Sequence, residues 1–243
     1  MNKRVIVIAF ILFSIQLFAQ KVKPASEQVM NTMNCYVVKA ARFSQKVVNE
    51  IGEQFLNDDF IKGSITLANG KEFNNLDLNY NKLIDKVLFL NGLDTMTFLN
   101  PEELKIVNIG DSKFVYSWYK KEKDNVPGFF ELLADGSYKL LLKHEHIYIN
   151  EELALPYETP KGARYKFTEV YYLKAEKNNA VAFLNKGQLK RNFKKYNIKI
   201  SPIFKEYKLK YRKVEDLKEV FNQLNKNLAT YKKTEANITG DRS

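Results

Sequence analysis

Two histidines on one expected strand are the strongest candidates for metal chemistry in this sequence. His144 and His146 are the only histidines of the chain, and one residue separates them. Successive side chains of a strand point to opposite faces, so both imidazoles should lie on the same face, as two ligands of one metal ion require. Glu151 or Glu152 is the candidate third ligand. The alternative interpretation is the exposed end of a long hairpin strand, which needs no metal.

A cluster of positive charge near the C-terminus is the candidate binding site. The chain has a formal net charge of +11, and residues 186–213 alone contain eleven Lys or Arg with one acid, Glu206. Residues four apart on a helix lie on the same side, so this spacing predicts a cationic ridge that meets an anionic surface or partner. A solvated surface without a ligand is the alternative interpretation. The candidate residues are Lys190, Arg191, Lys194, Lys195, Lys208, Lys210, Arg212 and Lys213.

The common motifs of enzymes are absent from the sequence. There is no Gly-x-Ser-x-Gly motif for a serine nucleophile, and the ten glycines form no run that would cradle phosphate. Cys35 is the only cysteine, so no disulfide can form within the chain, and burial as a small apolar residue is the preferred interpretation. We therefore expect no enzyme activity and no cofactor.

The first nineteen residues predict export from the cytoplasm. A basic start at Lys3 and Arg4 precedes an apolar run over residues 5–13, and Ala19 is the small residue that signal peptidase needs. This run is much shorter than the ~20 residues that span a bilayer. We expect cleavage after residue 19 and a mature protein in the periplasm or outside the cell, with no transmembrane segment. Nucleic acid is not an expected partner there, whereas lipid headgroups, other anionic envelope surfaces and envelope proteins are.

The elements that must position these residues are mostly strands. Alternating apolar residues around Ile65 and Leu67 lead to Asn69-Gly70, which favours a hairpin turn with two positive φ angles, and Asp135-Gly136 marks a second hairpin. About eight to ten strands with short connections predict a mainly β protein with an antiparallel meander sheet, as a curved barrel or a sandwich. We expect one β-rich domain over residues 20–231.

Helices are expected at both ends of this domain. The apolar spacing over residues 27–51 favours a helix, although residues 35–38 also suit a strand. The helical C-terminal part, about residues 187–229, should supply two or three helices that pack on the sheet, the last of them beginning at Glu215 and Asp216. Residues 232–243 have no periodic pattern and are predicted to be a frayed tail.

Turn and core positions of the chain together resemble one known family. They are Gly63-x-Ile65-x-Leu67-x-Asn69-Gly70, Leu78-Asn79-Tyr80-Asn81 with Asp85 after it, Glu131-Leu132-Leu133-Ala134-Asp135-Gly136, Leu140-Leu141-Leu142-Lys143, Tyr171-Tyr172-Leu173 and Tyr207-Lys208-Leu209-Lys210. In these positions the chain resembles a family of exported proteins from Bacteroidota that has no assigned function. The resemblance spans nearly the whole mature chain and supplies no catalytic residue.

Two functions from different classes follow from these observations. The first is an exported, non-enzymatic binding or interaction protein of the cell envelope, in which the sheet is the scaffold and the basic C-terminal face meets an anionic surface or partner. The alternative is a periplasmic carrier of an apolar ligand such as a lipid, enclosed by a curved sheet and the C-terminal helix. An internal apolar cavity of several hundred Å³ would distinguish the carrier.

Overall fold

The fold is that of a computed structural model that describes residues 23–38, 54–150 and 164–240. The predicted signal peptide and the candidate ligands Glu151 and Glu152 lie outside the described residues.

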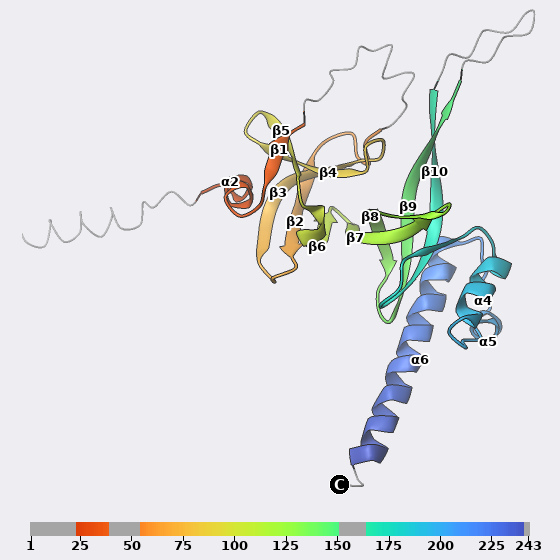
Figure 1. The fold of residues 1–243 in the computed structure, drawn as a ribbon. Coiled ribbons are helices and arrows are strands. Elements are labelled where there is room, and N and C mark those ends of the chain that lie inside the picture. The colour runs from red at the N-terminus through yellow and green to blue at the C-terminus, as the bar shows by residue number, and fades with distance from the viewer. Residues whose placement is uncertain (1–22, 39–53, 151–163, 241–243) are drawn as a thin grey trace, which may run out of the picture.

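The described residues form one antiparallel sheet of eleven strands (Figure 1), which confirms the predicted meander. The spatial order is β1-β5-β4-β3-β2-β6-β7-β8-β9-β10-β11, so most neighbours in space are neighbours in sequence. The sheet has two edge strands and is therefore not the closed barrel that was one of the predicted forms. The strands are Cys35–Val37 (β1), Ile61–Leu67 (β2), Glu72–Asn81 (β3), Lys86–Asn91 (β4), Asp94–Phe98 (β5), Leu104–Ile109 (β6), Ser112–Lys121 (β7), Asp124–Ala134 (β8), Tyr138–Ile149 (β9), Arg164–Ala175 (β10) and Val181–Phe183 (β11).

The hairpin between β2 and β3 uses a different turn from the one predicted. Only Gly70 has a positive φ, 86°, whereas Asn69 does not. The Asn69 side chain instead accepts a hydrogen bond from the backbone N–H of Lys71, at 2.9 Å. An Asn side chain that bonds the backbone two residues on stabilises a turn without a left-handed conformation of its own.

In the described N-terminal part the predicted helix ends early, and the alternative prediction of a strand around residues 35–38 is confirmed. Helix α2 covers only Ala25–Met30, and β1 follows as a short strand beside β5, with Cys35 opposite Phe98. Pairing with β5 supplies a ladder of hydrogen bonds, and this tertiary contact decides between the helix and the strand that the local sequence allows. The rest of the predicted helix, residues 39–51, lies outside the described residues.

Three C-terminal helices confirm the predicted helical part. They are Lys186–Lys194 (α4), Ser201–Glu206 (α5) and Val214–Gly240 (α6), and they lie at the β8 to β11 end of the sheet (Figure 1). Helix α6 extends to Gly240, into residues 232–243 for which the sequence predicts a frayed tail, and no Gly or Pro interrupts it earlier. The buried residues beneath these helices include Leu140, Leu173, Phe183, Leu189, Phe193, Ile203, Phe204, Leu217, Val220 and Phe221.

Strands β8 and β9 separate part of the way along the sheet. Their pairing runs from Ala134–Leu140 to Glu131–Leu142, whereas β9 and β10 stay paired as far as Ile149–Arg164. The β9–β10 ribbon therefore leaves the sheet as a long two-stranded arm (Figure 1). Backbone groups of β8 beyond this split need partners other than β9.

Strands β7 to β11 curl around a small core of their own. Tyr119 on β7 forms a parallel bridge with Ala180, just before β11. The Ala180 N–H donates to the Trp118 carbonyl at 2.9 Å, and the Lys120 N–H donates to the Ala180 carbonyl at 3.2 Å. The side chains inside this curl are Tyr119, Phe130, Leu141, Tyr172 and Ala180.

Candidate functional site

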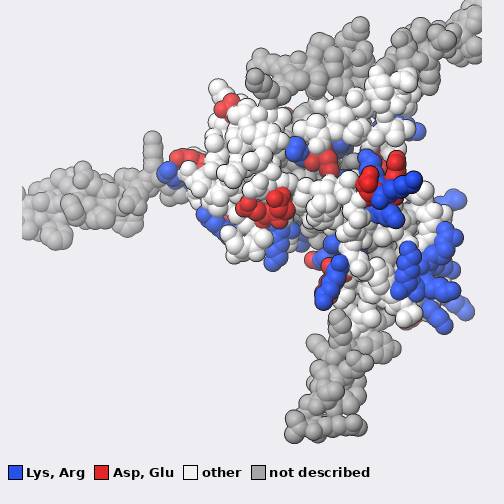
Figure 2. Space-filling view, viewed as in Figure 1, with Lys and Arg blue, Asp and Glu red and all other residues white. Residues whose placement is uncertain are grey.

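The predicted basic residues are exposed on α4 and on the segment that joins α5 to α6. Asn185 caps α4, since its Oδ1 accepts a hydrogen bond from the Gln188 N–H at 2.9 Å. Leu189, Asn192 and Phe193 are buried and attach α4 to the core, whereas its basic side chains from Lys190 to Lys194 are exposed. All eight residues are exposed, and we call them the basic face: Lys190, Arg191, Lys194, Lys195, Lys208, Lys210, Arg212 and Lys213. In Figure 2 blue side chains form a patch over the region of α4 and α5.

The charge of the basic face is not neutralised by neighbouring acids. Within the described part of the chain, none of its eight residues forms an ion pair with a carboxylate. The Asp216 carboxylate lies nearby but accepts a hydrogen bond from the backbone N–H of Lys210, at 2.7 Å, and so stabilises the turn before α6. The face therefore keeps a field that attracts anions.

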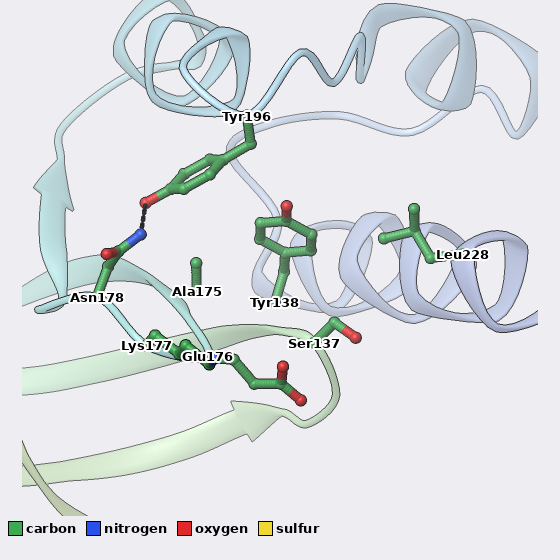
Figure 3. A pocket seen from close by; sticks show the side chains of 8 residues that line it. All are labelled: Ser137, Tyr138, Ala175, Glu176, Lys177, Asn178, Tyr196 and Leu228. Atoms are coloured by element: carbon green, nitrogen blue, oxygen red, sulfur yellow. Dashed lines mark hydrogen bonds between the residues drawn. The ribbon is translucent and has the colours of Figure 1, made fainter. Parts of the chain in front are cut away.

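A pocket of about 260 Å³ lies beside α4 and α6 (Figure 3). The rings of Tyr138 and Tyr196 are 5.4 Å apart, and Asn178 Nδ2 donates to the Tyr196 hydroxyl at 3.2 Å. The pocket is open to solvent, and Ser137, Glu176 and Asn178 make its lining partly polar. These features differ from the enclosed apolar cavity that a lipid carrier needs.

A buried ion pair occupies the split between β8 and β9. Asp85, in the turn after β3, reaches across the curled sheet to Lys143 on β9, with 2.7 Å between Oδ2 and Nζ. The Lys143 side chain is only 4% exposed, and its ammonium group also donates to the Phe129 carbonyl at 3.1 Å. The Phe129 N–H donates to Asp85 Oδ1 at 3.3 Å. The pair therefore satisfies the β8 backbone where β9 has left it.

The surroundings of this pair are aromatic. The Lys143 ammonium lies 5.1 Å from the Tyr119 ring centre and 4.9 Å from that of Phe130, within the range of a cation–π interaction. The Tyr80 hydroxyl donates to Asp85 Oδ1 at 2.6 Å. Burial, followed by the nearby Asp85 carboxylate, raises the pKa of Tyr80 well above its usual value and that of Tyr119 to about 12. Both phenols stay protonated at neutral pH.

A second hydrogen bond of the same kind continues the network along β9. The Tyr172 hydroxyl donates to Glu145 Oε1 at 2.6 Å, and burial together with this bond raises the pKa of Tyr172. The carboxylates of Asp85 and Glu145 thus have donors and the Lys143 ammonium has acceptors. Because these groups satisfy one another's hydrogen-bonding capacity, the arrangement stabilises the contact of the turn after β3 with β9 and of β9 with β10.

The two histidines have different surroundings. His144 is mostly buried, and its Nε2 lies 3.7 Å from Glu131 Oε2, which is too long for a hydrogen bond but close enough for attraction on protonation. The His146 ring packs against the rings of Tyr165 and Phe167, at 5.5 and 6.1 Å between centres. The described residues contain no group of three metal-binding side chains. Because Glu151 and Glu152 are outside them, the metal site stays a prediction.

The pocket residues and the buried pair were not among the sequence-predicted site residues. Asp85 was noted only as a turn position, and Lys143 only as the end of an apolar run. A lysine directly after three leucines on a strand is the one local signal that could have indicated a buried charge, because lysine is rarely buried without a partner.

Comparison of the chain with protein-family models, curated proteins and solved structures found no match. Among the described residues no helix has both the length and the apolar character to cross a bilayer.

Proposed function

We propose that the protein is an exported, non-enzymatic binding protein of the cell envelope whose basic face binds the phosphate groups of an anionic lipid surface. The observation that carries the proposal is eight exposed cations on α4 and on the segment that joins α5 to α6, without an acidic partner among the described residues. Clusters of Lys and Arg next to a membrane are a recognised means of binding acidic lipid headgroups.

The expected strength follows from the number of charges that reach the surface together. Each Lys or Arg near an anionic membrane contributes about 1 kcal/mol, so four at once contribute about 4 kcal/mol, or roughly a thousandfold in affinity. Attraction between exposed charges is screened beyond about 8 Å at physiological salt. Binding should therefore be strong at low salt and largely lost at high salt.

Buried side chains attach α4 and α5 firmly to the core. Leu189 and Phe193 anchor α4, and Phe204 anchors α5 while its ring also packs under the Lys186 ammonium at 4.1 Å. Cations held on a packed surface meet a charged membrane without much additional ordering. The carrier alternative has no comparable support, because Tyr80, Phe114 and other core side chains fill the inner side of the sheet.

The test is cosedimentation of the predicted mature chain, residues 20–243, with vesicles. Phosphatidylcholine vesicles with and without phosphatidylglycerol should be compared at low and high salt. The variant Lys190→Glu/Lys194→Glu/Lys195→Glu reverses three charges of the basic face. Its matched control, Lys120→Glu/Lys121→Glu/Lys123→Glu, makes the same change of net charge at the exposed turn between β7 and β8.

We expect the basic-face variant to bind acidic vesicles at least tenfold more weakly than the control, since three lost attractions of about 1 kcal/mol each exceed that ratio. Equal binding by the two variants would show that net charge alone matters and would refute a specific face. Binding to pure phosphatidylcholine that persists at high salt would refute the electrostatic mechanism.

A further inference from the structure

A second pocket, distinct from the basic face, gathers three lysines around one end of the curl of β7 to β11. Its volume is about 260 Å³, and Lys105 on β6, Lys139 on β9 and Lys174 on β10 all line it. Asp135 is the only carboxylate of the lining. Three ammonium groups and one carboxylate leave this pocket with a charge of +2.

Two of these lysines are in an unfavourable arrangement. Lys139 and Lys174 lie directly opposite each other in the register of β9 and β10. Like charges at opposed positions destabilise a sheet. Burial and the neighbouring Lys139 ammonium together lower the pKa of Lys174. A protein that only needed a stable ribbon would not require two cations at this position.

The contacts of the three lysines leave two of their ammonium groups able to bind an anion. Lys139 forms an ion pair with Asp135, and Lys174 Nζ donates to the neutral Asn178 carbonyl at 3.0 Å. Lys105 is exposed and forms no ion pair with another described residue. An anion in the pocket could therefore accept from Lys105 and Lys174 while Lys139 keeps Asp135.

The rest of the lining consists of two residues with a hydroxyl group, Tyr116 and Ser117, and an apolar wall. Ser117 is 7% exposed, and its hydroxyl has no hydrogen-bond partner among the described residues. Ile106, Val115 and Leu132 supply apolar contact. A ligand that satisfies both parts has an anionic head and a small apolar body.

We propose that this pocket binds a small phosphate monoester with a short apolar or aromatic body. A dianionic phosphate matches the charge of +2, and its several oxygens can accept from two ammonium groups and the Ser117 hydroxyl at once. The volume of about 260 Å³ is slightly below the usual range of ligand pockets, which suits a small ligand and not a whole lipid.

Isothermal titration calorimetry at low salt tests this proposal, with phenyl phosphate as the probe and inorganic phosphate as its comparison. The informative variants are Lys174→Met, which keeps the length of the side chain, and Ser117→Ala. Lys121→Met removes an exposed lysine outside the pocket and is the matched control. The basic-face triple variant separates this pocket from the surface of the proposed function. Thermal unfolding of each variant verifies that it folds.

We expect phenyl phosphate to bind the wild type and the basic-face variant equally, and to bind Lys174→Met at least tenfold more weakly, because a hydrogen bond from a charged donor is lost. Ser117→Ala should weaken binding several-fold, and Lys121→Met should leave it within twofold. No binding to the wild type, or equal binding to Lys174→Met, overturns the proposal. If inorganic phosphate binds with the same affinity as phenyl phosphate, the pocket does not recognise the apolar body of the ligand, and that part of the proposal is wrong. If the basic-face variant no longer binds phenyl phosphate, the ligand binds the basic face and not this pocket.

Discussion

Removal of the Asp85 carboxylate should destabilise the protein far more than removal of its partner Lys143. Asp85→Ala leaves a buried ammonium group with one carbonyl, that of Phe129, and two ring faces. At 2.7 Å and an effective dielectric constant of about 20 the direct attraction is about 6 kcal/mol, and desolvation of the two charges offsets part of it. Breaking a buried pair from one side typically destabilises by about 3–5 kcal/mol, which is the loss we expect.

Truncation of Lys143 instead leaves the Asp85 carboxylate, which water can hydrate. In Lys143→Met, the Asp85 side chain, 31% exposed, can hydrate while it still accepts from the Tyr80 hydroxyl and the Phe129 N–H. Methionine also fills the space of the lysine stem against the rings of Tyr119 and Phe130. We expect a loss of about 1–2 kcal/mol. The double variant should lose less than the sum of the two single changes, because it removes both charges together.

The assay is urea unfolding followed by circular dichroism, with the midpoint and slope fitted for each variant. Asp77→Ala is the matched control, since it breaks the exposed Lys62–Asp77 pair and should change stability by less than about 1 kcal/mol. A loss below about 1 kcal/mol for Asp85→Ala, or a loss from Lys143→Met as large as that from Asp85→Ala, would refute the reasoning.

Three further predictions concern single residues. Gly128→Ala places a Cβ 2.5 Å from Asp85 Oδ2 and 2.7 Å from Lys143 Nζ, so we expect a loss of about 1–3 kcal/mol in urea unfolding, part of which disappears in an Asp85→Ala background. His144, then Ser112, lowers the pKa of Glu131 from 4.5 against the effect of burial, so its carboxylate stabilises the fold above pH 4.5 and this contribution is lost as pH falls through the lowered value. Glu131→Gln should flatten the fall of the urea midpoint below pH 4.5, and an unchanged pH profile would contradict this. Burial raises the pKa of Cys35 to about 11, so Ellman's reagent at pH 8 should react at least tenfold more slowly than with glutathione until urea unfolds the chain; a fast native reaction would disprove it.

Local patterns predicted many of the elements and one surface. The alternation around Ile65 and Leu67, and the stripe that follows Glu215, correctly identified β2 and α6 because burial of one face repeats at the period of each element. The exposure of the basic residues of α4 was also predictable, since lysines that flank Leu189 and Phe193 on a helix must face away from the core. Where a local preference was weak, as around Cys35, a tertiary strand pairing decided the structure.

The sequence by itself determined which side of each strand is apolar and where the chain turns. Only the tertiary structure decided which distant strands meet. Asp85 and Lys143 are 58 residues apart, and they meet because the sheet curls and β9 separates from β8. Lys139 and Lys174 face each other because of one particular register of β9 and β10. Periodicity identifies a face within one element, whereas curl, register and strand separation depend on the packing of all the strands together.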